Sequence, residues 1–208
     1  MPYITEINTN ATGASAFPDL ISSSEDGDTY YISGEINAIG YTSSQVWNKN
    51  NITIDGDVSG TGTRAVIKNL KVPLLSAVGA NFTFKNLVLQ YVSITNAINS
   101  EYLNMGAFLR QQPNDTGTLR FINCEVSGTV KGRSNIGGFV GKCGNAVFEN
   151  CVNKAAIEES EDEGMIDGGE DYDPYAEWEY IGGIAGSFGG EMRDCINNGQ
   201  IYCQKTNK

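Results

Sequence analysis

The sequence predicts an all-β fold, a right-handed parallel β-helix in which short strands stack into a solenoid. Three observations lead to this prediction: a strand motif recurs, a glycine-rich motif precedes its last copies, and the composition favours turns. The chain has 25 Gly but only 5 Pro, and 19% of its residues are charged, which is typical of many short strands joined by tight turns. Its 208 residues suffice for one sizeable core, so we expect a single β-helix domain over residues 1–208.

The strand motif reads apolar, any residue, Asn or Asp, then Cys or Leu. Its copies begin at Phe84, Phe121, Phe148 and Met192, and a weaker copy begins at Ile67. The spacing between copies varies while the motif persists, as in a solenoid whose loops differ in length between fixed rungs. One rung is too short to bury its own apolar face, so neighbouring rungs must stack.

Stacking about 4.8 Å apart places equivalent residues directly above one another. The repeat therefore predicts two ladders of side chains, one pointing inward and one at a tight corner where Asn satisfies unpaired backbone groups. The inward ladder would comprise Cys124, Cys151 and Cys195, continued by Leu87 and Leu70. The corner ladder would comprise Asn69, Asn86, Asn123, Asn150 and Asp194.

A glycine-rich motif precedes the last two strand copies. The segment from Ile136 to Gly141 matches that from Ile181 to Gly186, and Met105-Gly-Ala-Phe-Leu is a degenerate third copy. Together with the strands that follow, these motifs resemble the GLUG-type repeats of bacterial surface and adhesin-like proteins. That resemblance covers about half the chain and implies a role at the cell surface.

The first 40 residues resemble the opening of pectate-lyase-like β-helices, in which a short capping helix precedes a Gly-Asp-Thr turn and the first strand. Here residues 17–21 would form the helix, and residues 27–34 the turn and strand. Caps prevent end-to-end pairing of solenoids. Residues 203–208 offer no obvious cap, so we expect the stack to end there on a partner or on a further part of a longer chain.

The negative charge is concentrated in one stretch. The formal net charge is −11, and residues 158–179 hold 11 acids and no Lys or Arg, so the rest of the chain is neutral and this stretch is expected to loop out from the stack. Such a distribution argues against nucleic-acid binding. No window is long and apolar enough to span a membrane. The expected partner is a protein or glycan surface, with end-to-end or side-by-side assembly of subunits as a further expectation.

The acidic loop is the predicted binding site. Its aromatic residues, interleaved with charge, suit docking to a partner, although a solvated charge run is the default interpretation. Several carboxylates offer hard oxygen ligands that could bind calcium, but they depart from the EF-hand order, so no cofactor is expected, with calcium as the alternative. The binding residues would be Asp167, Glu170, Asp171, Asp173, Tyr175 and Trp178, and the first four are the calcium candidates.

Catalytic motifs are scarce. The chain has no His, which removes Ser-His-Asp and Cys-His sites. Its 5 Cys form no C-x-x-C pair, so reduced thiols that pack as small apolar groups are expected, with a Cys143–Cys203 disulfide left open. Glu149 and Arg193 occupy the same repeat position and are expected to form a cross-strand ion pair. The remaining candidate acids are Asp55, Asp57, Glu125 and Asp194, and the candidate bases are Arg120, Lys131 and Arg133.

These observations favour a non-catalytic structural or adhesion module that displays a surface on a cell or virion. The chain is accordingly expected not to be an enzyme. The alternative is a polysaccharide-cleaving, lyase-type enzyme, because many pectate-lyase-like β-helices cleave acidic polysaccharides. We expect an extracellular, cell-surface or virion location, although no signal peptide is evident in the sequence.

Overall fold

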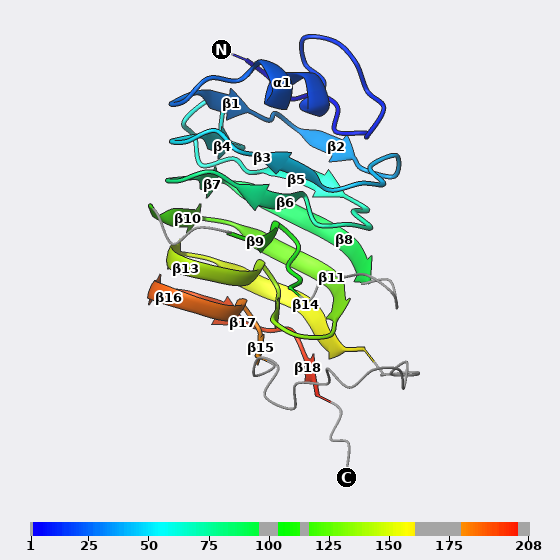
Figure 1. The fold of residues 1–208 in the computed structure, drawn as a ribbon, viewed down its shortest axis with the longest axis vertical. Coiled ribbons are helices and arrows are strands. Elements are labelled where there is room, and N and C mark those ends of the chain that lie inside the picture. The colour runs from blue at the N-terminus through cyan, green and yellow to red at the C-terminus, as the bar shows by residue number, and fades with distance from the viewer. Residues whose placement is uncertain (1, 96–103, 113–116, 161–179, 204–208) are drawn as a thin grey trace, which may run out of the picture.

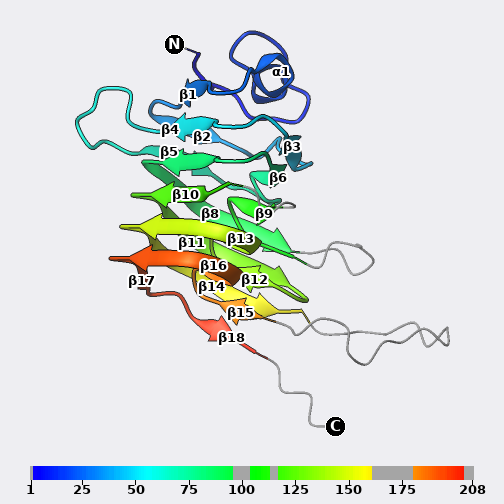
Figure 2. The same ribbon diagram turned by 60° about the vertical axis from the view of Figure 1, so that its left-hand side comes forward.

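A computed structural model describes residues 2–95, 104–112, 117–160 and 180–203. Parallel strands stack in successive rungs from a helix at the N-terminal end to β16, β17 and β18 at the other end (Figures 1 and 2). Two large sheets and one small sheet line the stack. The predicted all-β parallel β-helix with a short N-terminal capping helix is confirmed.

The larger sheet has nine strands and runs along one side of the solenoid. β16 (Ala185–Arg193) pairs with β13 (Val140–Glu149) and lies off the main strand order, β1-β4-β7-β10-β13-β9-β6-β3. The other members are β1 (Thr29–Tyr31), β3 (Gln45–Trp47), β4 (Thr53–Asp55), β6 (Leu75–Val78), β7 (Thr83–Lys85), β9 (Leu109–Gln111) and β10 (Leu119–Ile122).

The second sheet has seven strands, in the order β17-β14-β11-β8-β5-β2, and β18 pairs with β14. A third sheet contains only β12 and β15. The seven strands are β2 (Glu35–Asn37), β5 (Ala65–Lys68), β8 (Leu87–Thr95), β11 (Glu125–Gly132), β14 (Val152–Glu159), β17 (Ile196–Asn197) and β18 (Ile201–Tyr202). The small sheet pairs β12 (Ile136–Gly137) with β15 (Ile181–Gly182).

The N-terminal end is closed by α1 (Phe17–Ser23), where the capping helix was predicted. Proline in the first turn suits a helix start, because that position needs no backbone N–H partner. Phe17 is buried and its ring meets the indole of Trp47 edge-on, with centroids 5.6 Å apart. The Trp47 indole N–H donates to Ser24 Oγ at 2.8 Å, which ties the end of the helix to the core.

The core consists of columns of stacked inward side chains. Phe84, Phe121 and Phe148 are in register on β7, β10 and β13, and successive rings lie 5.2 and 4.9 Å apart in stacked geometry. A second stack joins Phe108 to Phe139, with centroids 5.3 Å apart. The recurring Phe of the strand motif is therefore the main packing element of the solenoid.

The corner ladder is confirmed for four of its five predicted members. Asn86, Asn123, Asn150 and Asp194 all adopt positive φ, between 51° and 55°, a backbone region that Asn and Asp tolerate better than most residues. The Asn123 amide donates to Asn86 Oδ1 at 2.8 Å, so the side chains also link successive rungs.

The weaker repeat copy was aligned wrongly. β5 pairs with β8 so that Ala65 lies beside Leu87 and Ile67 beside Leu89, which places Asn69 and Leu70 beyond the predicted ladders. Asn69 instead occupies another corner, where its amide donates to Asn37 Oδ1 at 3.0 Å. The reason is that β4, with Ile54 in register with Phe84, already fills that rung position.

The backbone of the glycine-rich motif passes close to Asn side chains of β14 and β17. Gly137 is in register with Gly182, and Met105 bridges to Ile136 as the third copy predicts. A Cβ at Gly138 would collide with the Asn153 side chain, and one at Gly183 would collide with Asn197. Glycine is therefore required by close approach.

The start of the acidic loop also differs from the prediction. Glu158 and Glu159 are the last residues of β14, not part of the loop. The backbone N–H of Ser160 donates to the Gly132 carbonyl at 2.6 Å, which anchors the end of this strand. The two glutamates pair in register with Lys131 and Gly132 of β11. The strand therefore extends two residues into the stretch that the charge pattern assigned to the loop.

Candidate functional site

The predicted binding residues fall in a part of the chain that the structure does not describe. Docking through this segment, and calcium binding by its carboxylates, therefore remain predictions. The residues concerned are Asp167, Glu170, Asp171, Asp173, Tyr175 and Trp178.

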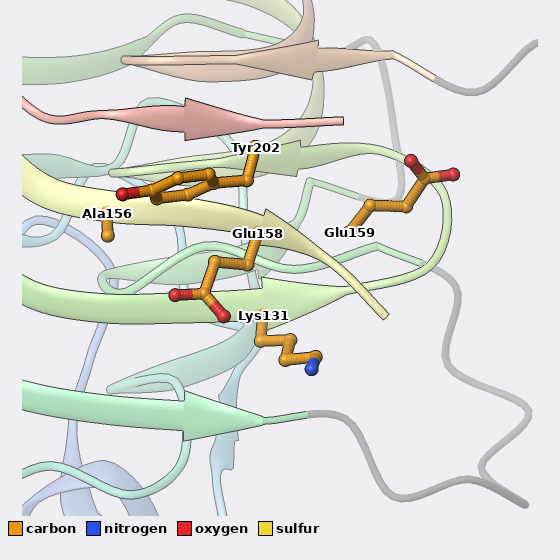
Figure 3. Close-up of a pocket in the computed structure, with 5 residues that line it drawn as sticks. All are labelled: Lys131, Ala156, Glu158, Glu159 and Tyr202. Atoms are coloured by element: carbon orange, nitrogen blue, oxygen red, sulfur yellow. The ribbon is translucent and has the colours of Figure 1, made fainter. Parts of the chain in front are cut away.

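A pocket of about 330 Å³ lies at the strand end that leads into the acidic segment, and we call it the C-terminal pocket. It is lined by Lys131 of β11, by Ala156, Glu158 and Glu159 of β14, and by Tyr202 of β18 (Figure 3). Residues from three neighbouring strands thus form one concave surface.

Strand register explains why these side chains converge. Lys131 pairs with Glu158, and Glu158 pairs with Tyr202, so the three form one outward column on adjacent strands. The Tyr202 side chain is 49% exposed, and its ring lies over the strand that carries Ala156 (Figure 3). The small Ala156 side chain leaves room beneath the ring, which creates the hollow.

Sequence reasoning missed Tyr202, although a signal was present. Val130, Ile157 and Ile201 end equivalent repeat copies, so the residues that follow them must share the outward column. Extending the alignment by one residue would have brought Lys131, Glu158 and Tyr202 together.

A second depression, which we call the polar groove, crosses the outer face of β10, β13 and β16. Its volume is about 520 Å³. The Asn145 amide of β13 donates to Thr118 Oγ1 at 3.1 Å, which links this strand to the residue that precedes β10. The lining residues are Thr118, Arg120, Asn145, Val147, Glu149, Gly190, Glu191 and Arg193.

The predicted neighbourhood of Glu149 and Arg193 is confirmed, but the ion pair is different. The two residues lie opposite each other on β13 and β16. The Arg193 guanidinium pairs with the Glu191 carboxylate of its own strand. Residues two apart in a strand point to the same face, so the Glu191 carboxylate also lies within reach of the long Arg193 side chain.

Glu125 is held in a structural charge cluster. Its carboxylate lies 2.6 Å from Lys154 Nζ and 3.2 Å from an Arg64 guanidinium nitrogen. Partial burial acts to raise the pKa of Glu125, but the hydrogen bond from Lys154 and the two positive charges outweigh it and lower the pKa. A carboxylate held ionised in this way stabilises the sheet surface and is poorly suited to donate a proton.

Asp55 and Asp57 also have local partners. Asp55 lies 3.3 Å from Lys85 Nζ and accepts the Asn86 amide at 2.8 Å. Asp57 accepts the backbone N–H of Gly62 at 2.7 Å and that of Thr61 at 3.1 Å. These backbone hydrogen bonds, chiefly that from Gly62, lower the pKa of Asp57. Both acids therefore organise turns and corners.

The structure pairs none of the five cysteines in a disulfide, and burial makes Cys143 and Cys195 poor nucleophiles. Cys124 and Cys151 are fully buried, and all five cysteines are free, so the Cys143–Cys203 disulfide is not formed. Burial raises the pKa of Cys143 to about 12 and also raises that of Cys195. Because the thiolate is the reactive form, we assign these thiols to packing.

Grouped metal ligands and membrane-spanning helices are both absent from residues 2–95, 104–112, 117–160 and 180–203. No three His, Cys, Asp or Glu side chains in these ranges are grouped to hold a metal ion. No helix in the same ranges has the length and hydrophobicity to cross a bilayer.

Comparison with known proteins supports the fold. No protein-family model matches the sequence, and no curated protein matches it. A crystal structure from Bacteroides ovatus, of a protein described as a candidate immunoglobulin A1 protease, is similar with a TM-score of 0.51 and 16% sequence identity. The likeness covers 86% of this chain and 72% of that one. At this identity it shows a shared fold alone, and the GLUG resemblance gains no family-model support.

The prediction that the chain is not an enzyme is corrected by this likeness. A protein of similar fold is described as a candidate protease, so a β-helix scaffold is no ground for excluding catalysis. The absence of His removes only His-dependent sites, whereas carboxylate and Ser-Lys catalysts need none. The prediction rested on the missing His, the missing C-x-x-C pairs and the resemblance to surface proteins, and none of these excludes the remaining catalytic classes.

Proposed function

We propose that this β-helix is a structural or adhesion module that displays a binding surface on a cell or virion, and that it binds a basic protein surface through the C-terminal pocket. The observation that carries this proposal is an exposed Tyr202 beside Glu158 and Glu159, at the start of the acidic stretch of the sequence. An aromatic anchor within a charged rim is a common composition for a protein interface.

Electrostatics support the choice of a basic partner. Two carboxylates and one amine line the pocket, and the chain as a whole carries a formal net charge of −11. The electrostatic field of a negatively charged protein speeds its association with a positively charged surface. Dissolved salt screens this field, so the effect weakens as the salt concentration rises. The resemblance of the repeats to GLUG-type surface proteins supports a cell-surface setting.

The test measures binding of lysine-rich, neutral and acidic proteins by calorimetry at low and high salt. We expect binding to the lysine-rich protein alone, weakened by salt and by about tenfold in each of Tyr202→Ala and Glu158→Gln. Tyr91→Asn removes a more exposed tyrosine elsewhere, at a positive φ that Asn tolerates, and should leave binding unchanged. Equal binding by all variants would overturn the proposal.

A second candidate function is binding and cleavage of an acidic polysaccharide in the polar groove. Two arginines, Arg120 and Arg193, line this groove together with Glu149 and Glu191. Guanidinium groups bind carboxylates well because they can donate two parallel hydrogen bonds, and a neighbouring carboxylate can exchange protons.

Incubation with pectate, alginate and hyaluronan, followed by assay of unsaturated and reducing ends, tests this second function. Immunoglobulin A1 is tested in parallel, with peptide fragments on a denaturing gel as the readout, because the similar structure is described as its candidate protease. Turnover that Arg120→Gln abolishes would place an active site in the groove, and turnover insensitive to this change would exclude the groove.

A further inference from the structure

Among the described residues, apolar side chains of the core are left exposed at the C-terminal end of the solenoid. Phe188, Met192 and Ile201 are 37%, 39% and 42% exposed. Each continues an inward column: Met192 lies in register with Phe148, and Ile201 with Ile157, both of which are fully buried. The last described rung therefore leaves apolar side chains where a further layer would cover them.

The edge strand at this end is available for pairing. β16 hydrogen-bonds to β13 along one side, and no other described strand pairs with it. Its side chains point to the two faces of the sheet, so they leave the hydrogen-bonding edge clear. A strand edge of this kind is a template for a second strand.

A second copy of the chain can meet this end tail to tail. At the N-terminal end α1 lies over the core with Phe17 and Leu20 buried, so a copy stacked head to tail would meet a helix instead of an open rung. Two C-terminal ends can face each other about a twofold axis, which reverses the strand direction and makes the pairing antiparallel. Such an interface closes on itself, so it yields a dimer and not a filament.

Charge complementarity favours this arrangement. The triplet Glu191-Met192-Arg193 has an acid and a base flanking an apolar residue. A twofold axis at Met192 places Glu191 of each copy opposite Arg193 of the other, so two cross-strand ion pairs form. It also places Met192 against its equivalent, facing the shared core, because residues of equal parity keep the same face.

We propose that two copies of this chain associate tail to tail, with antiparallel pairing of β16 against β16 covering the open end of both cores. The dimer does not depend on the ligand proposed for the C-terminal pocket.

The test measures molar mass by light scattering coupled to size exclusion, over a range of protein concentrations. We expect a species of twice the 22.4 kDa chain mass. Glu191→Arg makes the triplet wholly basic and Arg193→Glu makes it wholly acidic, so each variant alone should dimerise at least about tenfold more weakly. An equimolar mixture should recover dimerisation as a heterodimer, which also shows that both variants are folded.

Glu25→Arg, a charge reversal in an exposed loop at the opposite end, is the matched control and should dimerise as the wild type does. A wild-type chain that stays monomeric at every concentration would overturn the proposal. A dimer that both triplet variants leave intact, or a mixture that gains nothing, would equally overturn it.

Discussion

The two ends of the solenoid solve the same packing problem differently. At the N-terminal end, Phe17 and Leu20 of α1 cover the first rung, and Trp47 beneath them is fully buried. At the C-terminal end, Phe188 and Met192 stay more than one-third exposed. The same columns of apolar residues run between both ends. This contrast shows that an inward side chain of a β-helix is buried only where a further layer packs on each side of its own rung.

The largest expected effect contrasts a buried apolar residue near the N-terminal end with an exposed one at the C-terminal end. Trp47→Ala should lower the free energy of unfolding by about 3–5 kcal/mol, since it removes a fully buried indole. Met192→Ala should cost less than about 1 kcal/mol, because its side chain already meets solvent.

Urea unfolding followed by circular dichroism measures both values. The measurement is made in the Glu191→Arg background, which we expect to be monomeric, so that dimerisation does not cover Met192. Similar losses for the two substitutions would show that the ends do not differ as described.

A smaller effect concerns the corner ladder. Asn150 holds a φ of 51°, so Asn150→Ala should lower the free energy of unfolding by about 1–2 kcal/mol, the usual cost of that backbone region for other residues. Asn150→Gly is the matched control, since Gly adopts positive φ without steric cost, and should cost less. Asp194→Ala, at the equivalent corner of the terminal rung, should cost less than Asn150→Ala. Equal costs for all three would show that φ does not govern these corners.

The smallest expected effect is a pH dependence of the free energy of unfolding, which arises from Glu125 in the middle of the stack. The pKa of Glu125 is lower in the folded chain than in the unfolded one, so its ionised form stabilises the fold above the unfolded-state value of about 4.3. That contribution is lost as pH falls through the folded-state pKa.

Glu125→Gln should therefore reduce stability by less than about 1 kcal/mol near neutral pH and should flatten the acid limb of the stability curve below about pH 5. Thermal unfolding at several pH values measures this. If the stability curve of Glu125→Gln below about pH 5 were the same as that of the wild type, Glu125 would not contribute to acid destabilisation.

Much of the fold could be predicted because the repeat carries it. Phe84, Phe121 and Phe148 recur with the same neighbours, and their stacking follows directly from that recurrence. Asn69 shows the limit of this reasoning. Its local sequence resembles the motif, yet register is decided by which strand already occupies the position, here β4 with Ile54.

The candidate site was less accessible to sequence reasoning. The C-terminal pocket depends on three strands that are distant in sequence, and Tyr202 contributes only because β18 pairs with β14. The charge pattern assigned Glu158 and Glu159 to a loop, whereas backbone pairing keeps them in a strand. Residue type indicates charge, but only register indicates which charges share a surface.

The recurring corner at Asn86, Asn123, Asn150 and Asp194 has a consequence for how such a chain can change in length. The corner conformation is the same in each of these rungs, although the intervals between the copies differ. A duplicated gene segment that encodes one whole rung could therefore be inserted between two corners without altering the geometry on either side. The solenoid can lengthen or shorten in whole rungs by this route, while the capped and open ends keep their character.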